Sequence, residues 1–142
     1  MNLLRRCFAA FFLAIVPCVA ASAAEKPEKV VYHVNDNSHP MAALNNIRNH
    51  LNASPKATIV LVAHGPGIDF LLDGAIDNNG NPYDVVVREL AQRGVGFRVC
   101  NNTLEGRKID RKRVLPEATV VPSGVAEVAR LQAQEGYAYI KP

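Results

Sequence analysis

Short apolar runs alternate along most of the chain with segments in which apolar residues recur at helical spacing. The runs are rich in β-branched and aromatic residues and are bounded by turn-forming or charged residues, which is typical of β-strands. Five strands are therefore predicted, at residues 29–34, 57–63, 95–100, 118–121 and 137–140. The second run is almost continuously apolar, as in a strand that is covered on both faces of a parallel sheet.

The first connection between these runs carries a clear helix signal. Leu44, Ile47 and Leu51 recur at i, i+3 and i+7, which is the spacing of one buried helix face. Ser38 can cap this helix, and Pro40 is tolerated in its first turn. We therefore expect a helix that begins near residue 38 and faces a core.

Further helices are predicted in the remaining connections, at about 68–72, 81–94, 105–115 and 123–134. Pro82 and Asp84 suit the start of the second of these, and Gly94 suits its end. Ser123 can cap the last helix and Gly136 can end it.

Strands joined by helix-length connections cannot pair as hairpins, so the sheet should be mostly parallel, with helices on both faces. The expected fold is an α/β three-layer sandwich with a mostly parallel five-stranded sheet. Residues 24–142 are expected to form one such domain, without internal repeats.

The first 23 residues have the three parts of a secretory signal. Two arginines supply positive charge, Cys7 to Ala21 form an apolar run, and Ala21-Ser22-Ala23 offers small residues to a signal peptidase. The alternative is a retained membrane anchor, but Pro17 interrupts the run, which is shorter than the roughly 20 apolar residues of a spanning helix. We expect a cleaved signal and a bacterial periplasmic protein with no membrane attachment after cleavage.

Cleavage would change both the charge and the cysteine content. The whole chain has a net charge of +3 and three cysteines. Loss of Arg5 and Arg6 would remove two of these charges, which leaves nucleic-acid binding with little electrostatic support. Loss of Cys7 and Cys18 would leave Cys100 as a single thiol in an oxidising compartment, where it is either a reactive group or an intermolecular partner.

Polar and reactive side chains follow the predicted strands. Cys100 ends the third strand and His64 follows the second, while Asn35 and Asp36 follow the first and Ser123 follows the fourth. Sites in open α/β sheets form at the carboxyl ends of strands. These side chains can therefore share one edge of the sheet, although they are distant in sequence.

Cys100 is the strongest catalytic candidate at this edge. The polar residues 101–103 suit a turn and a helix start, and a thiolate at a helix N-terminus has a lowered pKa. Arg98 and Arg107 would lower the pKa further if they point toward the sulfur. The alternative is a buried structural cysteine, but the strand-end position and the polar neighbours predict that Cys100 is not fully buried.

His64 could orient the Cys100 thiol or act as its base, and it could equally be an ordinary loop histidine. The turn from His64 to Gly67 could bend into an anion-binding nest or be a plain turn. The candidate ligand-binding residues are His64, Gly65, Gly67, Arg98, Asn101, Asn102 and Thr103.

Several common kinds of site have no support in the sequence. His33, His39 and His50 have no metal-ligand spacing, and Pro82 stands where a calcium loop would need glycine. No P-loop, Rossmann fingerprint or nucleophile elbow occurs, so neither a metal nor a cofactor is expected. The basic residues 107–113 are interpreted as a solvated helix face, or as a surface for an acidic partner or an anionic sulfur species.

Two regions resemble the DsrE/DsrF-like family. They are Phe97-Arg98-Val99-Cys100-Asn101-Asn102-Thr103-Leu104 and the tail in which Val121-Pro122-Ser123-Gly124-Val125-Ala126-Glu127 is followed by Gln134-Glu135-Gly136-Tyr137-Ala138-Tyr139-Ile140. The order of elements also matches over residues 29–142. The resemblance implies a compact α/β fold that forms homo-oligomers, often trimers or hexamers, with the cysteine loop near subunit contacts.

In the best-understood relatives, which are cytoplasmic, the matching cysteine carries sulfane sulfur as a persulfide and passes it to a partner thiol. The resemblance therefore implies that Cys100 is a sulfur carrier or thiol relay rather than a turnover enzyme, with a thiol-bearing protein or a small sulfane-sulfur donor as partner. Two alternatives stay open. One is a non-catalytic homo-oligomeric protein that binds a small ligand at the strand-end edge, and the other is an intersubunit disulfide at Cys100.

Overall fold

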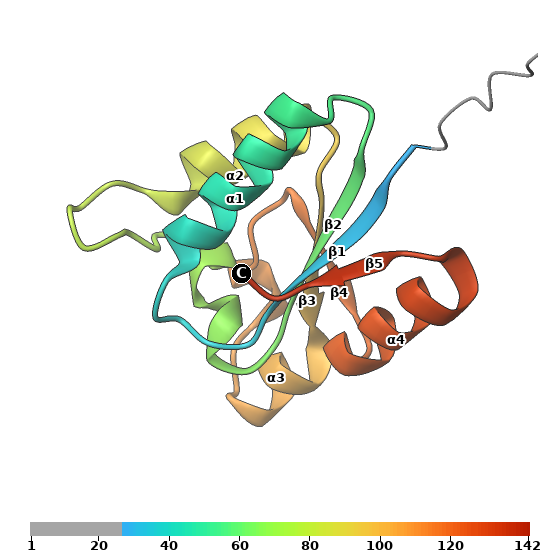
Figure 1. Cartoon of the computed structure of the whole chain (residues 1–142). Coiled ribbons are helices and arrows are strands. Elements are labelled where there is room, and N and C mark those ends of the chain that lie inside the picture. Colours follow the sequence, from blue (N-terminus) through green and yellow to red (C-terminus); the bar gives the residue numbers. More distant parts are fainter. Residues whose placement is uncertain (1–26) are drawn as a thin grey trace, which may run out of the picture.

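The computed structural model describes residues 27–142, which form a five-stranded sheet with helices on both faces (Figure 1). All four strand pairings are parallel, and the strand order is β4-β3-β2-β1-β5. The strands are β1 (Lys29–Val34), β2 (Thr58–Ala63), β3 (Gly96–Cys100), β4 (Ala118–Val121) and β5 (Ala138–Ile140). The predicted α/β fold with a five-stranded parallel sheet is confirmed.

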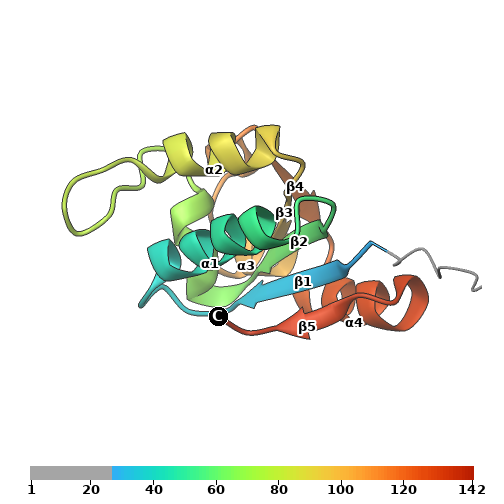
Figure 2. The same cartoon turned by 45° about the horizontal axis from the view of Figure 1, so that its top comes forward.

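Helices separate successive strands, as the parallel pairing requires. They are α1 (Pro40–Ala53), α2 (Tyr83–Gln92), α3 (Asn101–Gly106) and α4 (Gly124–Glu135), with 3-10 turns η1 (Gly65–Leu71) and η2 (Arg111–Arg113). Figures 1 and 2 show α1 and α2 together on one face of the sheet and α4 on the other. α3 follows β3 directly and therefore lies at the carboxyl end of the strands.

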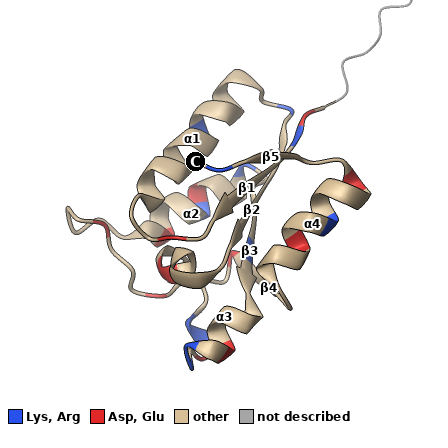
Figure 3. Cartoon of the chain, turned by 60° about the horizontal axis from the view of Figure 1, so that its bottom comes forward, with Lys and Arg blue, Asp and Glu red and all other residues tan. Residues whose placement is uncertain are grey.

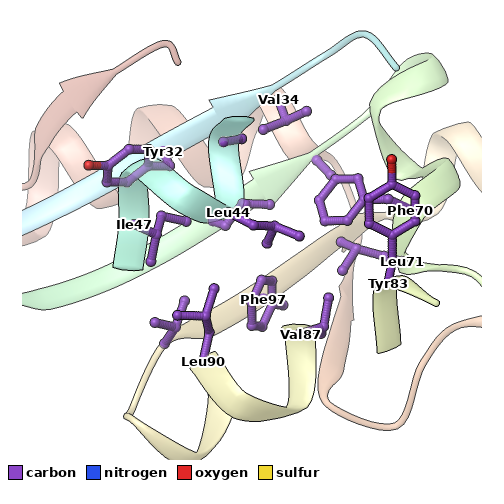
Figure 4. Packing of buried hydrophobic residues seen from close by; sticks show 14 of the residues in the cluster. Tyr32, Val34, Leu44, Ile47, Phe70, Leu71, Tyr83, Val87, Leu90 and Phe97 are labelled. Carbon is purple, nitrogen blue, oxygen red and sulfur yellow. The ribbon is translucent and has the colours of Figure 1, made fainter. Parts of the chain in front are cut away.

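Strand alternation divides the core into two unequal parts. The larger part lies between the sheet and α1, α2 and η1, where Leu44 and Ile47 of α1 and Leu90 of α2 pack with Phe97 of β3 (Figure 4). The smaller part lies under α4 and consists of Val31, Val60, Val62, Val128, Leu131 and Tyr137. The sheet face under α4 is therefore the less covered of the two.

The helix predicted over 105–115 is wrong. α3 already ends at Gly106, and Lys108 has a left-handed backbone (φ 54°), which a continuing helix does not allow. Arg113 Nε bonds Asp73 at 2.6 Å, and the Leu115 N–H bonds the Leu71 carbonyl at 2.9 Å. These bonds tie the segment to the residues around η1, and it forms only the short 3-10 turn η2 before β4. Figure 3 shows its positive positions just beyond α3.

Two predicted helix starts are also wrong in detail. α1 begins at Pro40 and has no side-chain cap, because the Ser38 hydroxyl bonds Asp36 instead. α2 begins at Tyr83, after the residues near 81 have formed a loop around the Asp77 carboxylate. The signals for α4 are confirmed: Ser123 accepts a bond from the Ala126 N–H at 3.4 Å.

The export signal predicted for residues 1–23, with Cys7 and Cys18, lies outside the described residues. Within residues 27–142, no helix has both the length and the apolar character that a membrane crossing requires.

Candidate functional site

Cys100 is the last residue of β3 and also the N-cap residue of α3. Its side chain lies on the α4 side of the sheet, because Val99 belongs to the core under α1 and α2 and successive strand residues alternate. Cys100 is only 3% exposed, so the prediction that it would escape burial is wrong. The reason is tertiary, since the start of α4 covers the sulfur.

Gly124, the first residue of α4, brings Cys100 and His64 together. A Cβ placed on Gly124 would lie 3.1 Å from the Cys100 Cβ and 3.1 Å from the His64 Cβ. Such a contact is tighter than almost all real Cβ contacts, so the close packing of the three residues depends on the missing side chain. The structure thus confirms that His64 and Cys100 share the strand-end edge.

The immediate surroundings of Cys100 lower the pKa of its thiol below the usual value. The largest single influence is burial, which opposes ionisation. Hydrogen bonds from the Gly124 N–H, the Thr103 hydroxyl, and the Thr103 and Asn102 N–H groups together outweigh it. These N–H groups come from the first turns of α3 and α4, so two helix N-termini converge on one sulfur.

Thr103 has a fixed hydrogen-bonding direction. The Gly65 N–H donates to the Thr103 hydroxyl oxygen at 2.9 Å. This bond uses an acceptor lone pair and leaves the hydroxyl hydrogen free to point at the sulfur. Thr103 therefore couples the turn after β2 to the Cys100 thiol.

The two arginines expected to stabilise the thiolate are engaged elsewhere. Arg98 Nε lies 3.7 Å from the Glu127 carboxylate, and Arg107 Nη1 lies 2.6 Å from the Asp69 carboxylate. Neither is among the groups that shift the pKa of Cys100. The arginines do not point toward the sulfur, so the condition on which they were expected to lower its pKa is not met.

The turn at 64–67 is held by its own N–H groups. The Gly65 N–H is bonded to Thr103, and the Gly67 N–H is bonded to the His64 carbonyl at 3.1 Å. A Cβ on Gly67 would come within 2.4 Å of the Val34 carbonyl oxygen, so glycine is needed for close packing against β1. These contacts favour the plain turn over the anion-binding nest.

The asparagines of the cysteine loop face in different directions. The Asn101 amide donates to the Glu105 carboxylate at 2.7 Å, while its Oδ1 is buried without a partner. Asn102 is exposed, and its N–H also reaches the Pro122 carbonyl at 3.3 Å. Their roles in ligand binding stay predictions.

The sequence reasoning missed two side chains beside His64. The His33 ring stacks on the His64 ring with centroids 4.8 Å apart, and the Tyr139 hydroxyl is 2.8 Å from His33 Nδ1. Alternation along 29–34 places His33 on the Cys100 face, but its neighbours depend on which strands flank β1. Within residues 27–142, no group of three His, Cys, Asp or Glu side chains is arranged to hold a metal ion.

Comparisons with known proteins bear on the fold and the family. Residues 28–142 match the model of the DsrE/DsrF-like family. A protein of unknown function from Methanobacterium thermoautotrophicum, MTH1491, is 32% identical and superposes with a TM-score of 0.72, covering 81% of this chain and 99% of its own. The ychN protein from E. coli is 14% identical with a TM-score of 0.67, covering 80% of this chain and 97% of its own, and shares the fold. No curated protein matches the chain.

Proposed function

Because the chain belongs to the DsrE/DsrF-like family, we propose that it is a sulfur carrier in which Cys100 holds sulfane sulfur as a persulfide. The observation that carries the proposal is the convergence of N–H groups from two helix starts, and of the Thr103 hydroxyl, on the Cys100 sulfur. These donors favour an anionic sulfur, which is the nucleophile in sulfur exchange.

Transfer would proceed in two balanced steps, with thiosulfate as an example of a donor. The Cys100 thiolate attacks the outer sulfur of thiosulfate, a new S–S bond forms, and sulfite leaves with the electron pair of the broken S–S bond. An acceptor thiolate then attacks the terminal sulfur of the Cys100 persulfide and releases the Cys100 thiolate. No external oxidant or reductant is consumed, because the sulfane sulfur moves from one sulfur atom to another.

The burial of Cys100 favours a small donor for loading. With 3% of the residue exposed, a protein thiol would need the start of α4 to move before it reached the sulfur. The same burial disfavours the intersubunit disulfide, because Cys100 sulfurs of two subunits would have to meet at the surface. Non-reducing gel electrophoresis tests the intersubunit disulfide, because a covalently linked dimer would support it.

Intact-mass spectrometry after incubation with thiosulfate or polysulfide tests the carrier role. The wild-type protein is expected to gain about 32 Da, one sulfur atom, and to lose it on addition of an excess of a small thiol. Cys100→Ser is expected to gain nothing. If wild-type Cys100 reacts with iodoacetamide and yet acquires no sulfur, the carrier role is excluded.

We also propose that the protein acts in the periplasm as a homo-oligomer. The signal-like residues 1–23 support export, and the family resemblance supports self-association. Val125 and Tyr139, on α4 and β5, are 61% and 43% exposed, and both lie on the α4 side of the sheet, where one helix alone covers the strands. N-terminal sequencing of the protein from a periplasmic fraction is expected to begin near Ala24; a chain recovered only from cytoplasm with Met1 intact would contradict export.

A non-catalytic ligand-binding role is the second candidate, and one observation favours it. Asn35 Oδ1 and Asn101 Oδ1 are buried without partners near the ends of β1 and β3, where a bound ligand could supply donors. Under this alternative, the Cys100→Ser variant would still bind the ligand, and cells that carry it would behave like cells with the wild-type protein. Under the carrier proposal, cells that carry the same variant would behave like cells that lack the protein.

A further inference from the structure

Three ring side chains form a row that leads from the Cys100 site to the surface. His64 follows β2, His33 lies in β1 and Tyr139 lies in β5, and these three strands are neighbours in the sheet (Figure 2). The His64 and His33 rings are 4.8 Å apart with planes tilted by 30°, and the Tyr139 hydroxyl is 2.8 Å from His33 Nδ1. Tyr139 is 43% exposed, so the His64–His33–Tyr139 row reaches solvent at its outer end.

The row lies on the same face of the sheet as the Cys100 sulfur. His33 alternates with Tyr32 and Val34, which belong to the larger core on the opposite face. Tyr139 is in register with Val31, a residue of the core under α4. At the inner end, His64 and Cys100 both pack against Gly124.

Both imidazoles of the row keep a nitrogen that no described group satisfies. Nε2 of His33 and Nε2 of His64 are buried and have no hydrogen-bond partner. Buried polar atoms in proteins are nearly always paired, and an unpaired one is costly. Two phenyl rings would fill the same space without this cost, so the pair of imidazoles calls for an explanation other than packing.

The two stacked rings cannot both carry a positive charge at low cost. Burial is the main cause that lowers the pKa of His33, and the nearby charges of His64 and Lys141 lower it further. The groups that face His33 are His64 after β2, Tyr139 of β5 and Lys141, with Asp36 and His39 lining the same small cavity of about 100 Å³. The short distance between the rings therefore favours at most one positive charge on the pair.

We propose that His64 exchanges a proton with Cys100 during sulfur transfer, and that His33 and Tyr139 are positioning residues that hold His64 for this exchange. The inference rests on the proposed carrier function. The Cys100 thiol gives its proton to His64 when the sulfur attacks the donor, and the proton returns from His64 to the Cys100 thiolate when the acceptor has taken the sulfur. The proton is thus conserved over one loading and unloading cycle.

The pH dependence of Cys100 alkylation by iodoacetamide tests the row without requiring sulfur transfer. His64→Phe is expected to slow alkylation at neutral pH by roughly 100-fold and to move the profile to higher pH, because the thiol then lacks its proposed proton acceptor. His33→Phe and Tyr139→Phe are expected to cause smaller losses, about 10-fold, with profiles moved in the same direction. Each variant is first shown to unfold cooperatively, as the wild type does.

Tyr32→Phe provides a matched control. The Tyr32 hydroxyl is 3.0 Å from His50 Nδ1, which is the same kind of bond, and Tyr32 lies in the core on the other face of the sheet. Its profile is expected to overlay that of the wild type. If Tyr139→Phe and His33→Phe also overlay the wild type while folded, the positioning role is overturned.

An NMR titration of the imidazole signals provides a readout that packing alone would not move. In His64→Phe the pKa of His33 is expected to rise, because one repelling charge has been removed while burial is retained. An unchanged His33 pKa would overturn the coupling of the pair. Persulfide formation is measured in parallel: failure of the wild type to gain sulfur excludes the carrier role, whereas the alkylation profiles still decide the role of the row.

Discussion

At the scale of single residues, the approach of Cys100 to His64 depends on Gly124. Both side chains begin 3.1 Å from the place where a Gly124 Cβ would stand. Glycine near the start of a helix usually weakens it, so Gly→Ala would ordinarily be neutral or stabilising. Here the added methyl group meets two buried neighbours, which reverses the expected sign.

Gly124→Ala is therefore expected to destabilise the protein by about 1–3 kcal/mol and to change the rate of Cys100 alkylation. Urea unfolding and iodoacetamide kinetics measure the two effects. Gly106→Ala, at the end of α3, is the matched control, because nothing lies within 4 Å of its added Cβ. Equal stability of the two variants would contradict the packing argument.

Thr103 acts on Cys100 through a single hydroxyl. Thr103→Val keeps the side-chain shape but removes a donor to the thiolate, so the pKa of Cys100 should rise toward the ordinary thiol value. It also leaves the Gly65 N–H without its acceptor, at a cost of about 1–2 kcal/mol. The absorbance of the thiolate as a function of pH measures the first effect.

Thr103→Val should also change how the free energy of unfolding depends on pH. A thiol with a lowered pKa in the folded state contributes stability that is complete above the unfolded value of about 8.5 and is lost as the pH falls through the folded pKa. The stability difference between wild type and Thr103→Val should therefore widen as the pH rises from neutrality to about 9. Thr119→Val, at an exposed position of β4, should show no such trend.

At the scale of elements, the first turn of η1 packs directly on the end of β1. A Cβ added to Gly67 would lie 2.4 Å from the Val34 carbonyl oxygen. This oxygen is a backbone atom, so it cannot move aside as the end of a side chain can. Gly67→Ala is expected to cost about 2–4 kcal/mol and to displace His64, whose carbonyl accepts from the Gly67 N–H. Thermal unfolding measures the cost, with Gly106→Ala again as control; a loss below about 1 kcal/mol would contradict the argument.

At the scale of the whole molecule, one face of the sheet is covered by α4 alone. The exposed Val125 and Tyr139 lie on this side, next to Gly124 and His33. If a second copy of the chain covers them, self-association and the Cys100 site are physically linked, because the outer end of the His64–His33–Tyr139 row would become buried. A change in assembly would then change the access of solvent protons to the site.

Val125→Glu tests this link. A charge at a subunit contact is expected to lower the molar mass that light scattering measures, because burying an unpaired charge is costly. Val85→Glu is the matched control, since Val85 is 57% exposed but lies on α2, in the opposite layer. The contact is refuted if Val125→Glu retains the wild-type mass, or if both variants lose it equally.

The sequence by itself determined the order of elements, the parallel sheet and the position of Cys100 at a strand end. These features follow from apolar spacing, from helix-length connections and from chain direction, all of which are local or topological. The same local logic correctly identified the Ser123 cap. It failed for residues 105–115, where bonds of Arg113 and Leu115 to the distant η1 region prevail over helix propensity.

Only the tertiary structure decided how Cys100 is surrounded. The burial of its sulfur by Gly124, the engagement of Arg98 and Arg107 with carboxylates, and the stacking of His33 on His64 all join residues that are at least 24 positions apart. Such contacts depend on strand order and on the packing of α4 against the sheet, which apolar spacing along the chain does not encode. The candidate thiol and the helix start at Asn102 and Thr103 could therefore be located from the sequence, while the contribution of Gly124 to the surroundings of the sulfur could not.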